Sequence, residues 1–379
     1  MFLKKNIKKV RSLFSNFAVV GLATTALFWG ANTASVNAQT ADDVDAPTGG
    51  TTNKLLDFNG NGTTDFVTLA LPVGGAIGWR VLGNPASPLP NQALIRRFDF
   101  GLADDDSIVT GDYVGDNKTE LAVFRNTAAS APGIFYLAQF PLGTAGLTLD
   151  RAVTWGNGFT DVAGATGDYD GDGKVDYTVI RVVGTAAANN VFWYILSSAT
   201  NTAKVISFGS TVNVTGLSVF PGADFNGDGR DELVLVARNA SGNTVTFYGG
   251  DSNTGAGVIT RSFGNFNTDF NSYPADYTGD GRADFVSIRE TDPSLNAVWY
   301  VQNSATGAVT ATRFGISDPA FTDLDLPLHG DYDGDNRQDI AVYRPSNRTF
   351  YYISSQFGNI RAQQFGDAGD SPLAGFGYY

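Results

Sequence analysis

The sequence predicts an all-β fold, a β-propeller of six four-stranded blades. A nine-residue acidic segment occurs six times, and successive copies start 55, 56, 56, 52 and 55 residues apart. Regular self-similarity at this period is typical of architectures in which each unit packs on its neighbours. The chain has 379 residues, 42% of them hydrophobic, with 45 Gly and 14 Pro. This composition provides for a large core with many tight turns and excludes wholesale disorder.

Each repeat contains four short segments that favour strands. A β-branched and aromatic run follows the acidic segment, as at 177–180, and a second aromatic run comes next, as at 298–301. The fourth segment leads into the next acidic segment. The unit is therefore a propeller blade rather than a coil of a β-solenoid, which repeats at a shorter period. The third strand ends in an aromatic-glycine pair: Phe100-Gly101, Trp155-Gly156, Phe208-Gly209, Phe263-Gly264, Phe314-Gly315 and Phe365-Gly366.

The C-terminal segment allows two interpretations. Six blades are complete by Gly366, and residues 367–379 resemble the stretch before an acidic segment but stop where that segment should begin. They form either a strand that closes the ring beside blade one or the start of a seventh blade. Because closure removes exposed sheet edges, we favour the closing strand.

The N-terminal residues differ in kind from the repeats. Residues 1–38 combine a basic start, an apolar run at 18–27 and a small-residue cleavage site ending at Ala38, which predicts a secretory signal peptide. A retained membrane anchor is the alternative, although the apolar run is short for a span. We expect residues 39–52 to be a flexible leader and 53–379 to be the propeller. The predicted localisation is secreted, extracellular or periplasmic, with no membrane insertion after signal removal.

Charge and composition narrow the possible partners. The full chain has a formal net charge of −13, and removal of the signal, which holds five basic residues and no acid, leaves −18. Nucleic acid and anionic membranes require a basic face, so neither is an expected partner. The chain has no Cys and a single His, which excludes disulfides, thiolate metal sites and His-pair zinc sites. We expect that histidine, His329, to be a packing residue.

The acidic segments have the pattern of loops that surround a hard cation. In the third copy, carboxylates occupy positions one, three, five and nine, and position seven offers a backbone carbonyl. Ca²⁺ accepts six to eight such oxygen ligands, whereas Mg²⁺ prefers rigid octahedral sites. Position four is always Gly and position six is Gly or Asn, residues that tolerate left-handed backbone angles. The predicted Ca²⁺ ligands are Asp57, Asn59, Asn61, Thr63 and Asp65 in loop one; Asp112, Asp116, Lys118 and Glu120 in loop two; Asp168, Asp170, Asp172, Lys174 and Asp176 in loop three; Asp224, Asn226, Asp228, Arg230 and Glu232 in loop four; Asp276, Thr278, Asp280, Arg282 and Asp284 in loop five; and Asp331, Asp333, Asp335, Arg337 and Asp339 in loop six.

Two other interpretations compete with calcium loops. An EF-hand needs a bidentate Glu at position twelve and flanking helices, but position twelve here is Thr, Val, Leu or Ser in a predicted strand. Metal-free Asp-Gly turns do not require carboxylates at positions one, five and nine together. We expect the strongest occupancy in loops three and six, which carry four carboxylates. We expect the weakest in loop two, where Val114 occupies position three.

The loops, the aromatic second strand and the aromatic-glycine pairs resemble the FG-GAP/VCBS repeat family, which includes the propellers of integrin α-subunits and many secreted bacterial proteins. The resemblance extends over about 53–366. It implies Ca²⁺ loops between the first and second strands of each blade, on one face of the ring, with the ligands named above. Val114, Thr278 and the missing seventh loop depart from the family's pattern.

A secreted recognition or adhesion module for a glycan or an extracellular protein is the function that these observations favour, with Ca²⁺ bracing the blades. A polysaccharide-degrading, lyase-like enzyme is the alternative, since some lyases resemble calcium-bearing propellers. Such an enzyme needs a positioned base or a carboxylate pair outside the loops. The acids outside the loops are scattered and nearly the whole chain is repeat, which favours binding over catalysis.

Two further side-chain features recur. We expect the aromatic stripes at Trp193, Trp299 and Tyr351 to belong to the core rather than to sugar platforms. Arg recurs near the end of the strand after the loop, and we expect hydrogen bonds or carboxylate pairs between blades rather than a ring of ligand-binding donors. These arginines are Arg125, Arg181, Arg238, Arg289 and Arg344, with Ala70 in blade one.

Overall fold

The computed structural model describes residues 56–84, 95–126, 131–140, 147–185, 188–210, 216–239, 242–271, 274–289, 296–317, 324–374 and 377–378. The predicted signal peptide at 1–38 and the leader at 39–52 lie outside these residues. In the described part of the chain, no helix has the length and apolarity needed to cross a membrane.

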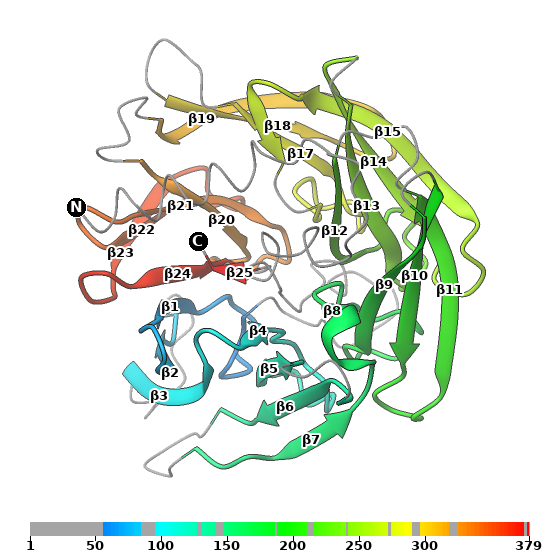
Figure 1. Cartoon of the computed structure of the whole chain (residues 1–379). Helices are drawn as coiled ribbons and strands as arrows, with labels where there is room; N and C mark the ends of the chain where they lie inside the picture. The colour runs from blue at the N-terminus through cyan, green and yellow to red at the C-terminus, as the bar shows by residue number, and fades with distance from the viewer. Residues whose placement is uncertain are drawn as a thin grey trace.

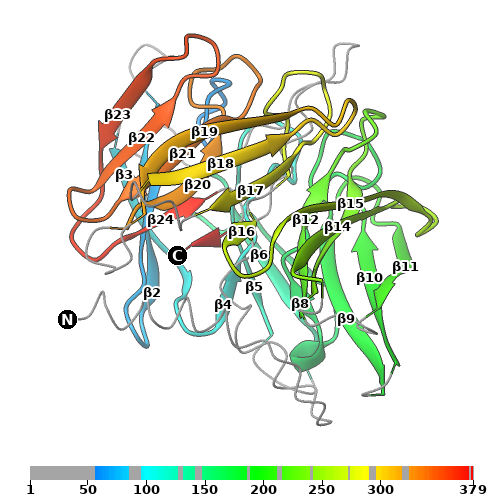
Figure 2. The same ribbon diagram turned by 90° about the horizontal axis from the view of Figure 1, so that it is seen from above.

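The described strands form six antiparallel sheets arranged around a common centre, as the blades of a β-propeller (Figure 1). Blades two to six are each continuous in sequence, and their four strands lie in chain order from first to last. A view after a quarter turn shows the blades as twisted sheets (Figure 2). The predicted all-β fold of six four-stranded blades is confirmed.

Blade one combines strands from both ends of the chain, whereas each of blades two and three is formed by one continuous segment of the chain. A short 3₁₀ turn, η1 (Gly158–Thr160), precedes blade three. In sheet order, blade one contains β25 (Gly377–Tyr378), β24 (Ser371–Ala374), β1 (Phe66–Ala70), β2 (Ala76–Leu82) and β3 (Ile95–Leu102); blade two β4 (Asp106–Ile108), β5 (Leu121–Arg125), β6 (Ile134–Ala138) and β7 (Arg151–Thr154); and blade three β8 (Val162–Ala163), β9 (Tyr177–Thr185), β10 (Ala188–Leu196) and β11 (Ala203–Ser210).

Blades four to six repeat the same arrangement. Blade four contains β12 (Gly216–Ala223), β13 (Glu232–Asn239), β14 (Thr244–Gly250) and β15 (Gly257–Asn265); blade five β16 (Asp269–Asn271), β17 (Phe285–Arg289), β18 (Asn296–Gln302) and β19 (Val309–Ile316); and blade six β20 (Leu326–Gly330), β21 (Asp339–Arg344), β22 (Thr349–Ile353) and β23 (Ile360–Gln364).

The C-terminal strand β24 closes the ring. It pairs antiparallel with β1, with Ser371 opposite Leu69 and Pro372 opposite Thr68. In Figure 1 the red β24 lies beside the blue β1, in the place that the first strand occupies in the other blades. The Thr68 hydroxyl also donates a hydrogen bond of 3.0 Å to Asp370. The predicted closing strand is therefore confirmed, and the tail does not begin a seventh blade.

The core lies between neighbouring blades. Each of the six clusters of buried apolar residues combines side chains from two adjacent blades, and one cluster joins Phe66 of blade one to Leu328 of blade six. Trp193 and Trp299 are fully buried, and their indole N–H groups donate to the carbonyls of the aromatic residues that end the following strand. They belong to the core as predicted. Tyr351 is half-buried.

The recurring arginines pair with carboxylates of their own blade. In blade three, Arg181 Nε and Nη2 lie 2.5 and 2.7 Å from the two carboxylate oxygens of Asp161, and the guanidinium lies 4.4 Å from the Tyr194 ring centroid. The predicted carboxylate pairing is found, but within the blade rather than between blades. The equivalent pairs are Arg125 with Asp106, Arg289 with Asp269 and Arg344 with Asp325.

Arg238 does not belong to this series. It lies 14 residues after the first aspartate of its loop, whereas the four paired arginines lie 13 residues after theirs. Because side chains alternate along a strand, Arg238 is on the opposite face of β13, and Ala237 occupies the equivalent position. Within the described residues Arg238 forms no ion pair, and burial lowers its pKa. The predicted series of five arginines is thus corrected to four.

Candidate metal centre

The six acidic segments form closely similar loops between the first and second strands of their blades, with the first strand of blade one supplied by β24. Positions one and nine are buried in every loop, and position four is exposed at the tip. The aromatic residue at position two anchors the loop in the core. In loop three this is Tyr169, whose hydroxyl donates a hydrogen bond of 2.7 Å to the Ala165 carbonyl.

The first carboxylate of each loop organises the curled backbone. In loop three, Asp168 Oδ1 accepts hydrogen bonds from the N–H groups of Gly171 and Asp172 at 2.7 and 3.1 Å, and Oδ2 accepts one from Gly173 at 2.7 Å. Positions four and six have positive φ angles in all six loops, between 61° and 84°. This confirms that the Gly and Asn pattern marks left-handed backbone.

The last carboxylate connects the loop to a neighbouring turn. In loop three, Asp176 Oδ2 accepts from the Tyr169 N–H at 3.2 Å, and Oδ1 accepts from the Ser198 N–H at 3.0 Å, just after β10. These supporting turns were not predicted from the sequence, although a Ser or Asn recurs after the aromatic strand and would have indicated them. The equivalent donors are Asn84, Ser304 and Ser355.

Four of the six loops gather three carboxylates in one place. In each, one oxygen from each of three acids lies within 4.8 Å of the others. Loop two, predicted to be the weakest, forms such a trio because positions one, five and nine suffice without position three. The trios are Asp112, Asp116 and Glu120 in loop two; Asp168, Asp170 and Asp176 in loop three; Asp224, Asp228 and Glu232 in loop four; and Asp331, Asp333 and Asp339 in loop six.

Loops one and five, both fully described, form no such trio. In loop one the Asn59 amide donates to Asp65 at 2.8 Å, while its buried Oδ1 accepts no hydrogen bond from the described residues. In loop five, Thr278 Oγ1 accepts a hydrogen bond of 2.7 Å from the Asn303 amide. Neutral side chains in these two loops therefore occupy places where loops three and six have carboxylates.

Burial of like charges raises the pKa of the last carboxylate in each loop. Burial first, and the neighbouring carboxylates second, raise the pKa of Glu120 to about 9 and that of Asp176 to about 8. The same causes raise the pKa of Asp339 and Glu232 to about 8. For Asp284 the pKa rises to about 7. A bound cation would compensate the charge that makes ionisation of these groups unfavourable.

The side chains at position seven reach the preceding loop. The stem of Arg230 in loop four passes over Gly171 in loop three, where an added Cβ would lie 2.6 Å from Arg230 Cγ. Lys174 passes over Gly115 in the same way, and an added Cβ there would lie 2.6 Å from its Cε. Position four is thus glycine for two reasons: its left-handed backbone and this close approach.

Backbone hydrogen bonds join all six loops in a closed ring. The carbonyl at position one of each loop accepts from the N–H at position eight of the next loop, and loop one donates back to loop six. The pairs are Thr119 to Asp57, Val175 to Asp112, Asp231 to Asp168, Ala283 to Asp224, Gln338 to Asp276 and Thr64 to Asp331, at 2.7–2.9 Å.

The chemistry of the loops fits a hard divalent cation. All candidate side-chain ligands in the four trios are carboxylates, and hard cations such as Ca²⁺ and Mg²⁺ bind oxygen. In loops two and four, a basic side chain forms an ion pair with one of the candidate ligands. Lys118 Nζ lies 3.1 Å from Asp116, and Arg230 Nη2 lies 2.9 Å from Asp228.

All 29 predicted ligands lie in the loops, and their individual metal roles stay predictions.

Fold and loops together define a β-propeller built from acidic-loop repeats. Residues 224–287, from loop four to β17, match the family model described as FG-GAP-like repeat. With its six blades, the protein fits an FG-GAP/VCBS repeat propeller, as the sequence resemblance implied. No curated protein matches the chain.

Several solved structures are similar to this chain at low identity. A functionally unknown protein from Desulfotomaculum acetoxidans is 10% identical, covering 82% of this chain and 99% of its own, with a TM-score of 0.37. A Lactobacillus plantarum protein is 12% identical over 79% and 80%, with a TM-score of 0.36. An exo-β-1,3-galactanase from Phanerochaete chrysosporium is 12% identical over 82% and 79%, with a TM-score of 0.34. Scores this low carry no argument about function.

Proposed function

We propose that the protein is a secreted, Ca²⁺-binding β-propeller that serves as a recognition or adhesion module for a glycan or an extracellular protein. The observation that carries the calcium part is the convergence of three carboxylates in each of four loops. Six to eight oxygen ligands and flexible geometry suit Ca²⁺ better than Mg²⁺. Loops three and six are the preferred sites, because each has carboxylates at positions one, three, five and nine.

Calcium has a structural role in this proposal. Each loop leads into the second strand of its blade, and its first and eighth residues bond to the neighbouring loops. An ion held by such a loop binds the folded chain and not the unfolded one, so it stabilises the fold. Rigid blades then present a fixed surface to a ligand.

Binding is favoured over polysaccharide cleavage by the state of the acids and the histidine outside the loops. The buried carboxylates Asp106, Asp161, Asp269 and Asp325 each form an ion pair with an arginine, so their oxygens already have a partner. His329 is fully buried, and burial lowers its pKa to about 3. A base in that position cannot reach a polysaccharide in solvent.

The test combines calcium binding with ligand capture by the chain from residue 39 onward. Calorimetric titration counts bound Ca²⁺, and a glycan array is read with Ca²⁺ and again with EGTA, beside a lyase assay. The variants Asp168→Asn and Asp331→Asn should each remove one of the strongest sites, while Asp150→Asn, an exposed acid outside the loops, should leave both intact.

Two results would overturn the proposal. The first is a melting temperature that EGTA does not change together with an absence of Ca²⁺ binding, since saturation at 100 Kd stabilises a fold by about 2.7 kcal/mol per site. The second is formation of cleaved polysaccharide that continues in EGTA, which would support the enzyme instead.

A further inference from the structure

Blade one differs from blades two, three, five and six on one face of its sheet. In blades two, three, five and six, an arginine near the end of the second strand stacks on a tyrosine of the third strand. In blade one, these two positions are Ala70 and Arg80. Gly78 lies opposite Ala70, where the other four blades have Ile, Phe, Val or Thr opposite the arginine. Blade one has therefore lost bulk at two adjacent positions.

The outer strand of blade one has a charged residue, Arg97, at a position that is neutral in every other blade. Across β2 and β3, Arg80 lies opposite Arg97 and Gly78 lies opposite Asp99. Alternation along a strand places these four positions on the same face of the sheet. The positions that match Arg97 hold Ala, Val or Thr in every other blade: Ala152, Val205, Thr260, Ala311 and Ala362.

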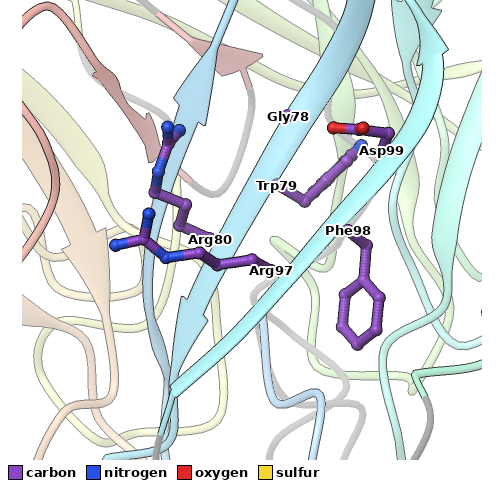
Figure 3. Close-up of a pocket in the computed structure, with 6 residues that line it drawn as sticks. All are labelled: Gly78, Trp79, Arg80, Arg97, Phe98 and Asp99. Atoms are coloured by element: carbon purple, nitrogen blue, oxygen red, sulfur yellow. The ribbon is translucent and has the colours of Figure 1, made fainter. Parts of the chain in front are cut away.

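These substitutions leave a hollow of about 220 Å³. Figure 3 shows the guanidinium groups of Arg80 and Arg97 side by side, while the Asp99 carboxylate points across Gly78. An added Cβ at Gly78 would lie 3.2 Å from the Ala70 Cβ and 3.7 Å from Asp99 Oδ1. The space that larger side chains fill in blades two, three, five and six is thus open here, and polar groups border it.

Donors and an acceptor are both available in the hollow. Arg80 is held by two carboxylates, with Nε 3.1 Å from Asp367 and Nη1 3.0 Å from Asp370. Among the described residues, Arg97 forms an ion pair with Asp367 alone, at 3.0 Å through Nη1, and its side chain is 60% exposed. Asp99 is exposed, and its side chain forms no hydrogen bond or ion pair with the described residues. Arg97 can therefore donate to a ligand, and Asp99 can accept from it.

The balance of charges selects the class of ligand. The guanidinium groups of Arg80 and Arg97 and the carboxylate of Asp99 line the hollow, and Asp367 and Asp370 already pair with the two guanidinium groups. An anionic ligand would have to compete with these two carboxylates for the guanidinium groups. A sugar hydroxyl both donates and accepts, which matches Arg97 beside Asp99. The volume is below the 300–1,000 Å³ of pockets for drug-sized ligands, which suits one sugar unit. We infer that this hollow in blade one binds an uncharged saccharide unit, an inference that rests on the proposed recognition function.

The experiment measures binding of neutral methyl glycosides of glucose, galactose, mannose and fucose by saturation-transfer NMR and calorimetry, in saturating Ca²⁺, with glucuronate as the anionic probe. Asp99→Asn removes the acceptor charge. Gly78→Val fills the hollow with the residue type found at the equivalent Val298. Asp150→Asn, which makes the same charge change on an exposed site in blade two, is the matched control. Melting temperatures check that each variant is folded.

At least one neutral glycoside should bind the parent protein, and it should bind Asp99→Asn and Gly78→Val about tenfold or more weakly. Asp99→Asn loses a hydrogen bond to a charged group, which is worth at least about tenfold in affinity, and Gly78→Val fills the space that the sugar would occupy. The control should bind like the parent protein. Equal binding by all variants would show that the saccharide binds elsewhere on the protein, and this result would contradict the assignment to blade one but not the proposed function. Binding of glucuronate alone, or of no glycoside in the panel, would overturn the assignment. If no glycan on the array bound the protein, the proposal of glycan recognition would be contradicted as well.

Discussion

Two glycines in adjacent loops allow the contact between loops to be measured as a difference in stability. Gly171 at position four of loop three and Gly229 at position six of loop four have similar left-handed backbones, with φ of +78° and +80°. Alanine at either should therefore cost a similar conformational free energy, about 1–2 kcal/mol. Only Gly171 is covered by the neighbouring loop. A Cβ there would lie 2.6 Å from Arg230 Cγ and 3.2 Å from the Gly229 carbonyl oxygen, whereas a Cβ at Gly229 meets nothing within 4 Å.

The steric contribution can be separated from the conformational one. Overpacking in a close contact typically adds about 1–3 kcal/mol. We therefore expect Gly171→Ala to lower the free energy of unfolding by about 2–5 kcal/mol and Gly229→Ala by about 1–2 kcal/mol. Gly229→Asn should be close to neutral, because Asn117 and Asn336 occupy position six in other loops with φ of 61° and 67°.

Urea unfolding of the calcium-saturated protein, followed by tryptophan fluorescence and circular dichroism, provides the comparison. The midpoints should fall in the order parent, Gly229→Asn, Gly229→Ala and Gly171→Ala, with the slopes unchanged. Equal midpoints for the two alanine variants would refute the reasoning, since they would show that the side chain at position seven does not pack on the preceding glycine.

Three further perturbations test other parts of the structure. Metal-stripped protein should lose thermal stability as the pH rises from about 4 to about 8. The pKa of Asp176 and Asp339 is raised to about 8 in the folded state, so the folded protein keeps protons in this pH range that the unfolded chain releases. A melting temperature that stays constant or rises with pH would contradict this. Arg181→Ala should lower the free energy of unfolding by about 3 kcal/mol, since it leaves the buried Asp161 without its cation, whereas Arg238→Ala should lower it by less than about 1 kcal/mol. Equal losses for the two variants in calorimetry would be inconsistent with the pairing of Arg181 and Asp161. Truncation after Gly366 removes β24 and should lower the melting temperature and expose blade one to limited proteolysis; an unaltered digestion pattern would argue against closure by β24.

The repeat in the sequence predicted the fold because period, strand pattern and turn residues all pointed to the same unit. The blade count and the closing role of the tail followed from the same repeat, and β24 beside β1 confirms both. The left-handed backbone at positions four and six was also predictable, because few residue types tolerate it.

Contacts between repeats could not be predicted from a pattern within one repeat. Arg238 was grouped with the other arginines by proximity, although a shift of one residue turns its side chain to the opposite face. Loop two gathers a carboxylate trio despite Val114, because convergence depends on where the backbone places positions one, five and nine. The hollow in blade one depends on Gly78 and Asp99 lying opposite each other across two strands, a register that the sequence does not display.

The hydrogen bonds between loops all run in one direction, each loop donating to the one before it. This is the geometry of a head-to-tail ring, in which a fixed rotation between neighbours sets the number of members at which the circle closes. The loops therefore help to select six units, in the way a subunit interface selects the size of a cyclic oligomer. A fragment with three blades would carry one unused donor end and one unused acceptor end. Two such fragments would have complementary ends and could restore the full circle by association.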